Sequence, residues 1–101
     1  MEFAGFDWDQ GNREKCQRHG VSITDIEAMF AATVFVATDP LHSVKEECFK
    51  AIGAGTEGQK LLVVFTWRTR GGETFIRPVS ARYMHQKEIK WYEEETSRPD
   101  H

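Results

Sequence analysis

The sequence predicts an α+β fold, with a small antiparallel sheet, two N-terminal helices and a C-terminal helix. Three observations predict it. Residues 60–79 hold two runs rich in β-branched and aromatic residues, separated by Gly71-Gly72, a pair typical of a tight hairpin turn. Asp9 and Ser22 each precede a helical pattern, where their side chains can cap the first turn. A chain of 101 residues has the length of one domain with a single core.

The N-terminal third is expected to hold an arm and two helices. Residues 3–8 are short and apolar, so we expect an edge strand or an anchoring arm there. A helix is predicted over 9–19, because Gly20 is a typical residue just after a helix end. A second helix is predicted to begin at Ser22 or Thr24. Its buried side is expected to hold Ile23, Ile26 and Phe30, with Met29 beside them.

The rest of the chain is expected to supply the sheet and the last helix. Residues 33–36 form a β-branched run followed by Asp39-Pro40, which predicts a short strand and a turn. Residues 41–45 are expected to form an exposed loop. The remaining predicted elements are a strand over 46–54, a turn at 55–58, the hairpin strands 60–70 and 73–79, and a helix over 83–95.

The hairpin places several arginines on one face of the sheet. With Gly71-Gly72 as the loop, Arg70 lies opposite Glu73, Arg68 opposite Phe75, and Thr66 opposite Arg77, and opposite residues point to the same face. We call this the arginine face; its predicted members are Val64, Thr66, Arg68, Arg70, Phe75, Arg77 and Val79. The other face is mostly apolar and is expected to be the core side, with Leu61, Val63, Phe65, Trp67, Ile76 and Ser80.

The charge distribution favours an anionic ligand near this face. The net charge is −3, yet residues 60–92 carry seven basic and two acidic side chains, and the acidic excess lies in 93–101. Guanidinium groups suit phosphate because each presents a planar fork of donors. The alternative, a polar surface with ordinary ion pairs, stays open on this evidence.

Several function classes find no support in the sequence. The apolar runs are much shorter than the roughly 20 residues of a membrane helix, and the N-terminus does not have the pattern of an export signal. We therefore expect a soluble, cytoplasmic protein with Cys16 and Cys48 as reduced thiols. The histidine spacing fits no metal motif and the glycines fit no nucleotide-binding loop, so neither metal nor cofactor is expected.

The residues resemble the BrnT family of toxins. The segments that carry the resemblance are Phe6-Asp7-Trp8-Asp9, Lys15, Arg18 to Ser22, Ala28-Met29-Phe30, Asp39-Pro40, Glu46-Glu47, Ile52-Gly53, Leu61 to Thr66 with Arg68, Ile76 to Arg82, Lys87-Glu88 and Tyr92. Two positions depart from the family pattern, because Cys16 stands where asparagine is expected and Cys48 where arginine is expected.

The resemblance implies a type II toxin with a RelE-like fold and a ribonuclease activity that blocks translation without a metal. It also implies a cognate, DNA-binding antitoxin similar to BrnA. The toxin would contact operator DNA only through this antitoxin. It implies one toxin domain over 1–95 and leaves 96–101 as a flexible acidic tail.

The same resemblance implies roles for named residues. Arg68, Arg77 and Arg82 match the family arginines and would stabilise the transition state. His19, on the same helix face as Lys15, is the first candidate for proton transfer, and Glu47 is the second. The residues expected to bind or position the phosphate are Lys15, Arg70, Thr66 and Ser80. The alternative function is a binding module for RNA or protein that uses the same arginine face without catalysis.

Overall fold

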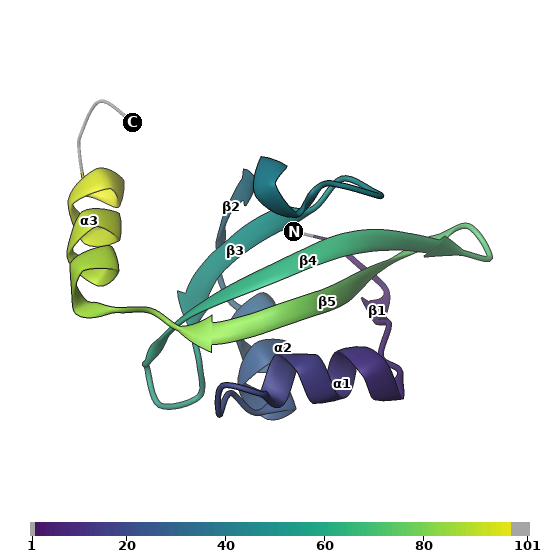
Figure 1. Ribbon diagram of the computed structural model, residues 1–101, viewed down its shortest axis with the longest axis horizontal. Helices are drawn as coiled ribbons and strands as arrows, with labels where there is room; N and C mark the ends of the chain where they lie inside the picture. Colours follow the sequence, from purple (N-terminus) through teal and green to yellow (C-terminus); the bar gives the residue numbers. More distant parts are fainter. Residues whose placement is uncertain (1, 98–101) are drawn as a thin grey trace.

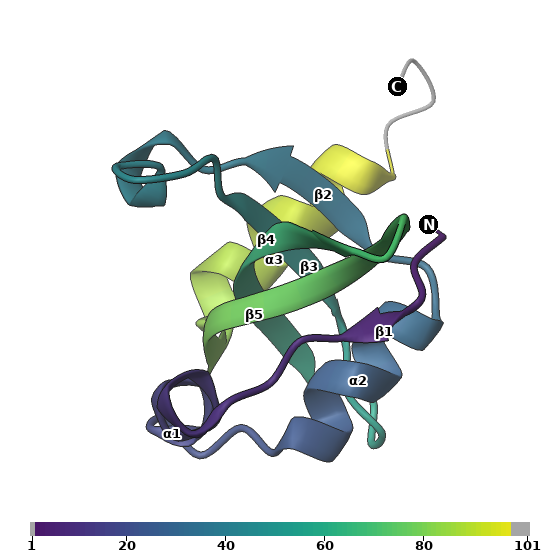
Figure 2. The same ribbon diagram turned by 90° about the vertical axis from the view of Figure 1, so that its right-hand side faces the viewer.

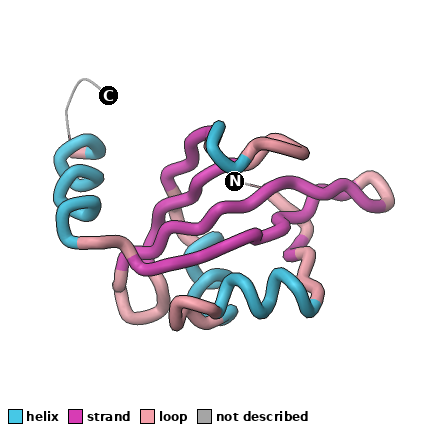
Figure 3. The backbone as a smooth tube through the Cα atoms, in the orientation of Figure 1, coloured by secondary structure: helices cyan, strands magenta, loops and turns pink. Residues whose placement is uncertain are grey.

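The computed structural model describes residues 2–97 and confirms the α+β class (Figures 1 and 3). Its helices are α1 (Gln10–Gln17), α2 (Ile23–Ala31), the short 3₁₀ helix η1 (Pro40–His42) and α3 (Gln86–Thr96). Its strands are β1 (Gly5–Phe6), β2 (Phe35–Thr38), β3 (Phe49–Ala54), β4 (Lys60–Arg70) and β5 (Glu73–Tyr83). The expected tail over 96–101 lies mainly outside the described residues, and its first residue, Thr96, belongs to α3.

The five strands form one sheet in the order β1-β5-β4-β3-β2. The sheet is mixed, so the expectation of a fully antiparallel sheet is wrong at one edge. The N-terminal arm pairs in parallel with β5, where the backbone amides of Ala4 and Asp7 donate to the carbonyls of Thr74 and Ile76. The arm thereby satisfies backbone groups that an open edge of β5 would leave unpaired.

The β4–β5 hairpin has the predicted register in its outer half. Arg70 pairs with Glu73, Arg68 with Phe75 and Thr66 with Arg77. Gly71 and Gly72 have φ of 57° and 80°, in the region that this turn requires and that glycine adopts without strain.

Beyond Thr66 the hairpin contains a bulge that changes which residues share a face. Phe65 pairs with Pro78 but Val64 pairs with Ser80, so β5 has one additional residue there. The predicted placement of Ser80 on the core face is therefore wrong, since Ser80 now lies with Val64 on the arginine face. Ala81, opposite Val63, takes the core position instead.

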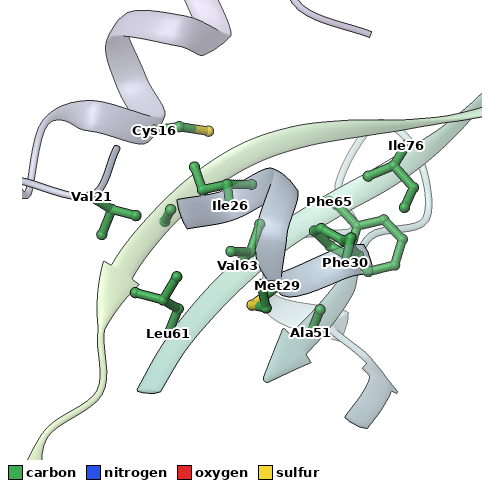
Figure 4. Packing of buried hydrophobic residues seen from close by; sticks show 11 residues of the cluster. Cys16, Val21, Ile26, Met29, Phe30, Ala51, Leu61, Val63, Phe65 and Ile76 are labelled. Atoms are coloured by element: carbon green, nitrogen blue, oxygen red, sulfur yellow. The ribbon is translucent and has the colours of Figure 1, made fainter. Parts of the chain in front are cut away.

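The core lies between the helices α1 and α2 and one face of the sheet (Figures 1 and 4). Its largest buried side chains include Phe65, Ile26, Met29, Leu61 and Ile76. Both predicted helix starts are confirmed, because Asp9 accepts a hydrogen bond from the Asn12 amide and Ser22 accepts one from the Asp25 amide. The opposite face of the sheet, which carries the arginines, is left uncovered by these two helices.

Other boundaries differ from the sequence prediction. Strand β2 begins at Phe35 rather than at residue 33, and β3 begins at Phe49 rather than at residue 46, because residues 40–48 form η1 and a loop. Helix α3 begins at Gln86 rather than at residue 83, since Tyr83 still belongs to β5. No residue of α3 is buried, and the helix stands at the end of the molecule (Figure 1).

Gly53 allows α2 to approach the sheet closely. A Cβ atom at this position would lie 2.5 Å from Cγ of Met29 and 3.1 Å from Cγ1 of Val34. Met29 is fully buried, so its side chain has little space to move away. Only glycine fits between this strand and this helix.

We expect the substitution Gly53→Ala to lower the free energy of unfolding by about 1–3 kcal/mol, the usual cost of overpacking a core. Denaturant unfolding measures this value. The matched control is a double-mutant cycle with Met29→Ala, in which the penalty at residue 53 should shrink because the clashing side chain is gone. An equal penalty in both backgrounds would contradict the steric explanation.

Candidate functional site

Three arginines gather on the uncovered face of the β4–β5 hairpin. Arg68 and Arg70 lie two residues apart on the same face of β4, and Arg77 lies on β5 opposite Thr66, diagonal to Arg68. Each arginine contacts a carboxylate that lies outside the hairpin. The arginine face is therefore a set of charge pairs rather than an array of free cations.

Asp7 and Asp9 hold two of these arginines. The Asp7 carboxylate is only 7% exposed, and it lies 3.1 Å from Nη2 of Arg70 and 3.5 Å from Nη1 of Arg77. Asp9 accepts a 2.8 Å hydrogen bond from Nη2 of Arg77. The backbone amide of Asn12 and then the Arg77 guanidinium hold the pKa of Asp9 below its usual value. These contacts fix Arg77, whose side chain is 21% exposed.

Glu46 holds the third arginine from the loop before β3. Its two carboxylate oxygens accept hydrogen bonds from Nη1 and Nη2 of Arg68 at 2.6 and 3.1 Å. This forked contact lowers the pKa of Glu46 and raises that of Arg68. Both side chains remain partly exposed, so an anion from solvent can reach the pair.

A hollow of about 320 Å³ opens between α1, the 43–48 loop and the hairpin. The side chains of Lys15, Arg68 and Arg77 supply its cationic lining, and Asp9 and Glu46 supply the acidic part. The structure thus brings together one predicted phosphate-binding residue and two of the predicted transition-state arginines. Its remaining lining residues are Gly11, Asn12, Pro78 and Val79.

Asn12 connects the segments around the hollow, and it was not among the predicted site residues. Its buried side-chain amide donates to the carbonyls of Asp7 and Pro78, at 2.9 and 2.8 Å, while its oxygen accepts from the Asp9 amide at 2.7 Å. One side chain therefore connects the N-terminal arm, the start of α1 and strand β5. The capping-box spacing from Asp9 to Asn12 is the only sequence signal that could have identified it.

Arg82 lies away from the hollow. Its guanidinium donates two 2.8 Å hydrogen bonds to the Glu88 carboxylate at the start of α3. This contact and the His85 backbone amide hold the pKa of Glu88 at about 2, and the pKa of Arg82 is raised. Arg82 is therefore engaged in attaching α3 and does not line the hollow with Arg68 and Arg77.

The other predicted site residues lie in several places. His19 is exposed in the turn after α1, one helical turn beyond Lys15. The Thr66 hydroxyl donates to the carbonyl of Glu47 at 2.8 Å, so it anchors the loop, and the Glu47 side chain is exposed. Ser80 is half-buried on the arginine face.

The two cysteines are buried thiols whose environment disfavours the reactive thiolate. Burial raises the pKa of Cys16 to about 11. Burial also raises the pKa of Cys48, with smaller contributions from the carboxylates of Glu46 and Asp39. Nearby cations, Lys15 for both thiols with Arg77 for Cys16 and Arg68 for Cys48, lower these pKa values by less than burial raises them.

Residues 2–97 contain neither a metal cluster nor a membrane-spanning helix. No group of three or more histidine, cysteine and acidic side chains is placed to hold a metal ion there. Within the same residues, no helix has both the length and the apolar character needed to cross a bilayer.

The fold and the site together define a small α+β protein with a cationic hollow on an open sheet face. Residues 8–88 match the family model described as the ribonuclease toxin, BrnT, of type II toxin-antitoxin systems. This match covers well over half of the chain, and the protein belongs to that family. A family of this kind implies an RNA target and a cognate antitoxin. No match to the chain was found among curated proteins.

We expect Asn12→Ala to lower the free energy of unfolding by about 1–3 kcal/mol, because two buried carbonyls lose their donor. Gln17→Ala is the matched control, since it removes an exposed amide from the same helix. Denaturant unfolding compares the two variants. Equal small losses would show that the buried amide contacts contribute little.

The Arg82–Glu88 pair predicts an acid-dependent loss of stability. The pKa of Glu88 is lower in the folded chain than its ordinary value of 4.5, so the pair stabilises the fold above that pH and loses this effect as the pH falls toward 2. Between pH 5 and pH 2.5 the wild type should lose more unfolding free energy than Glu88→Gln, which cannot titrate there. Parallel curves for the two proteins would contradict this assignment.

Proposed function

We propose that this chain is a metal-independent endoribonuclease that inhibits translation by cleaving messenger RNA. The observation that carries the proposal is the convergence of Lys15, Arg68 and Arg77 on one open hollow. Such a set of cations, two of them held in place by carboxylates, suits a phosphodiester, whose charge increases during cleavage. Membership of the ribonuclease toxin family supports the same activity.

The proposed reaction is an attack within the RNA itself. The ribose 2′-hydroxyl loses its proton and its oxygen bonds to the neighbouring phosphorus, while the bond from phosphorus to the 5′ oxygen breaks. The products are a cyclic phosphate and a free 5′-hydroxyl. Arg68 and Arg77 would stabilise the charge on the phosphorane oxygens, and Lys15 would bind the phosphate.

The carboxylates around the hollow support this role by orienting the arginines. An arginine has five N–H donors, and Asp7, Asp9 and Glu46 use only some of those on Arg68 and Arg77. The remaining donors are available to phosphate oxygens. Fixing the guanidinium groups beforehand reduces the entropy lost on binding RNA.

The arginine face also suits the cognate antitoxin. A BrnA-like partner that places acidic side chains over Arg68 and Arg70 would occlude the RNA and neutralise the toxin. Such a partner would carry the DNA-binding segment, so that operator DNA is contacted through the antitoxin. We place the activity in the cytoplasm, where messenger RNA is translated.

The test is induction of the chain alone in a bacterium, with growth and total RNA followed over time. The wild type should stop growth and fragment messenger RNA, and Arg68→Ala should abolish both effects because a transition-state cation is lost. Arg18→Ala is the matched control, since it removes an exposed arginine from beyond the hollow and should remain toxic. Arg68 is a better choice than Arg77, whose removal would leave the buried Asp7 with one fewer partner.

The outcome that contradicts the proposal is unimpeded growth with abundant folded wild-type protein. Purified protein that binds RNA through Arg68 without cleaving it would then indicate the alternative, a non-catalytic binding module. The first substitution to make in that case is Cys48→Arg, because it places at residue 48 the arginine expected from the family pattern.

A further inference from the structure

A histidine–aspartate pair lies on the same sheet face as the arginines. Nδ1 of His42 is 2.6 Å from Oδ2 of Asp39, and the Asp39 side chain is fully buried whereas the His42 side chain is 52% exposed. The pair belongs to the η1 segment, which the sequence predicted only as a turn and an exposed loop. Neither residue takes part in the phosphate contacts proposed for Lys15, Arg68 and Arg77.

Asp39 is unusual because a fully buried carboxylate has one oxygen without a hydrogen-bond partner. Oδ1 accepts no hydrogen bond from the described residues, and the nearest cation, Nζ of Lys50, is 3.9 Å away. The side chain also makes no capping bond to η1, although it occupies the N-cap position. Burying a carboxylate in this way is costly, so the contact with His42 is its principal compensation.

The register of the sheet places this pair in line with the arginine hollow. The Asp39 amide donates to the Cys48 carbonyl, and extending the β3–β4 register by one residue sets Cys48 opposite Thr66. Thr66 in turn pairs with Arg77. Asp39 and Arg77 are thus three strand spacings apart, about 14 Å between backbones, and the Arg77 guanidinium is held on the side of Asp7 and Asp9.

The segment that carries His42 also reaches the hollow directly. Ser43 donates to the Asp39 carbonyl and accepts from the Cys48 amide, which closes the loop, and Glu46 of the same loop binds Arg68. Figure 2 shows η1 and α1 at opposite borders of the sheet, with β4 and β5 between them. An RNA strand bound along Arg68 and Arg77 would therefore pass beside the η1 segment.

The contact fixes which ring nitrogen can accept a proton. A carboxylate only accepts hydrogen bonds, so Nδ1 of His42 carries the hydrogen and the neutral ring keeps its lone pair on Nε2. No other side chain in residues 2–97 hydrogen-bonds this imidazole. This is how a buried carboxylate orients the histidine base of many nucleophilic enzymes.

We propose that His42 is the general base of the ribonuclease site and that Asp39 is its positioning residue. The proposal rests on the function proposed above. Nε2 of His42 takes the proton of the 2′-hydroxyl as its oxygen bonds to phosphorus, and the departing 5′ oxygen takes a proton from water. His42 thereby takes the role that the sequence assigned first to His19 and then to Glu47.

The test uses the purified full chain and an RNA oligonucleotide spanning a site first mapped on a messenger RNA transcript. His42→Ala should lower the single-turnover cleavage rate by about 10²–10⁴-fold, the usual contribution of a general base. Added imidazole should restore part of the lost rate, a result that only a folded protein with an empty base position can give. Binding to the uncleavable 2′-deoxy oligonucleotide should be unchanged.

Three companion variants separate catalysis from loop structure. Leu41→Ala removes an exposed neighbour on η1 and should leave the cleavage rate unchanged. Asp39→Asn should lower the rate while retaining binding of the 2′-deoxy oligonucleotide. His42→Gln keeps a donor toward Asp39 and should retain the thermal stability of the fold but not the activity.

Two results would overturn the assignment while leaving the nuclease function intact. One is a His42→Ala protein that cleaves at the wild-type rate. The other is a folded His42→Ala protein that loses activity without imidazole rescue, while His19→Ala or Glu47→Ala shows rescue by added imidazole or formate. A wild-type protein that cleaves no RNA would overturn both the nuclease function and the role of His42.

Discussion

The buried amide of Asn12 is the contact on which the arrangement of the site depends. It joins three segments far apart in the sequence, because its donors reach the carbonyls of Asp7 and Pro78 and its oxygen accepts from the Asp9 amide. The arm is also held by its short parallel pairing with β5 and by the rings of Phe3 and Phe6, which pack on Phe30. The Asn12 amide adds the link between the arm, the start of α1 and β5 that sets Asp7 and Asp9 opposite the arginines. The hydrogen bonds of Asn12 thus position the carboxylates that in turn orient the arginines.

The side chains of the arginine face are held in position by carboxylates from two segments, the N-terminal arm and the 43–48 loop. The N-terminal arm brings Asp7 and Asp9 to Arg70 and Arg77 from one side, and the 43–48 loop brings Glu46 to Arg68 from the other. The more exposed of these pairs, Arg68 with Glu46, is of a kind that stabilises a fold only slightly. Their value here is in orientation, since a guanidinium held in place can meet a phosphate without first losing rotational freedom.

Helix α3 is attached differently from the rest of the molecule. It has no buried residue, and its contacts with the body include the Arg82–Glu88 pair and the ring contacts of Tyr92 with Phe35 and Lys60. A helix held by a few partly exposed contacts opens more readily than one packed into the core. Arg82 therefore connects α3 with strand β5, and a change at Glu88 would release this guanidinium.

The sequence by itself determined the elements whose causes are local. Asp9 and Ser22 cap their helices, Gly71-Gly72 forms the predicted turn, and the outer hairpin register places Arg68 opposite Phe75 as expected. Each of these follows from side chains only a few residues apart. The resemblance to the toxin family was also readable from the sequence, and the family match over residues 8–88 confirms it.

Only the tertiary structure decided which residues meet in the site. The bulge between Phe65 and Val64 moved Ser80 to the arginine face, and the parallel arm brought Asp7 beside Arg77, 70 positions along the chain. The Asp39–His42 contact depends on a loop that packs over the sheet and buries the carboxylate. Periodicity and capping are short-range effects. The bulge and the Asp7–Arg77 contact arise from pairing between distant segments, for which no local pattern exists. Asp39 and His42 are only three residues apart, but the burial of the carboxylate between them depends on tertiary packing.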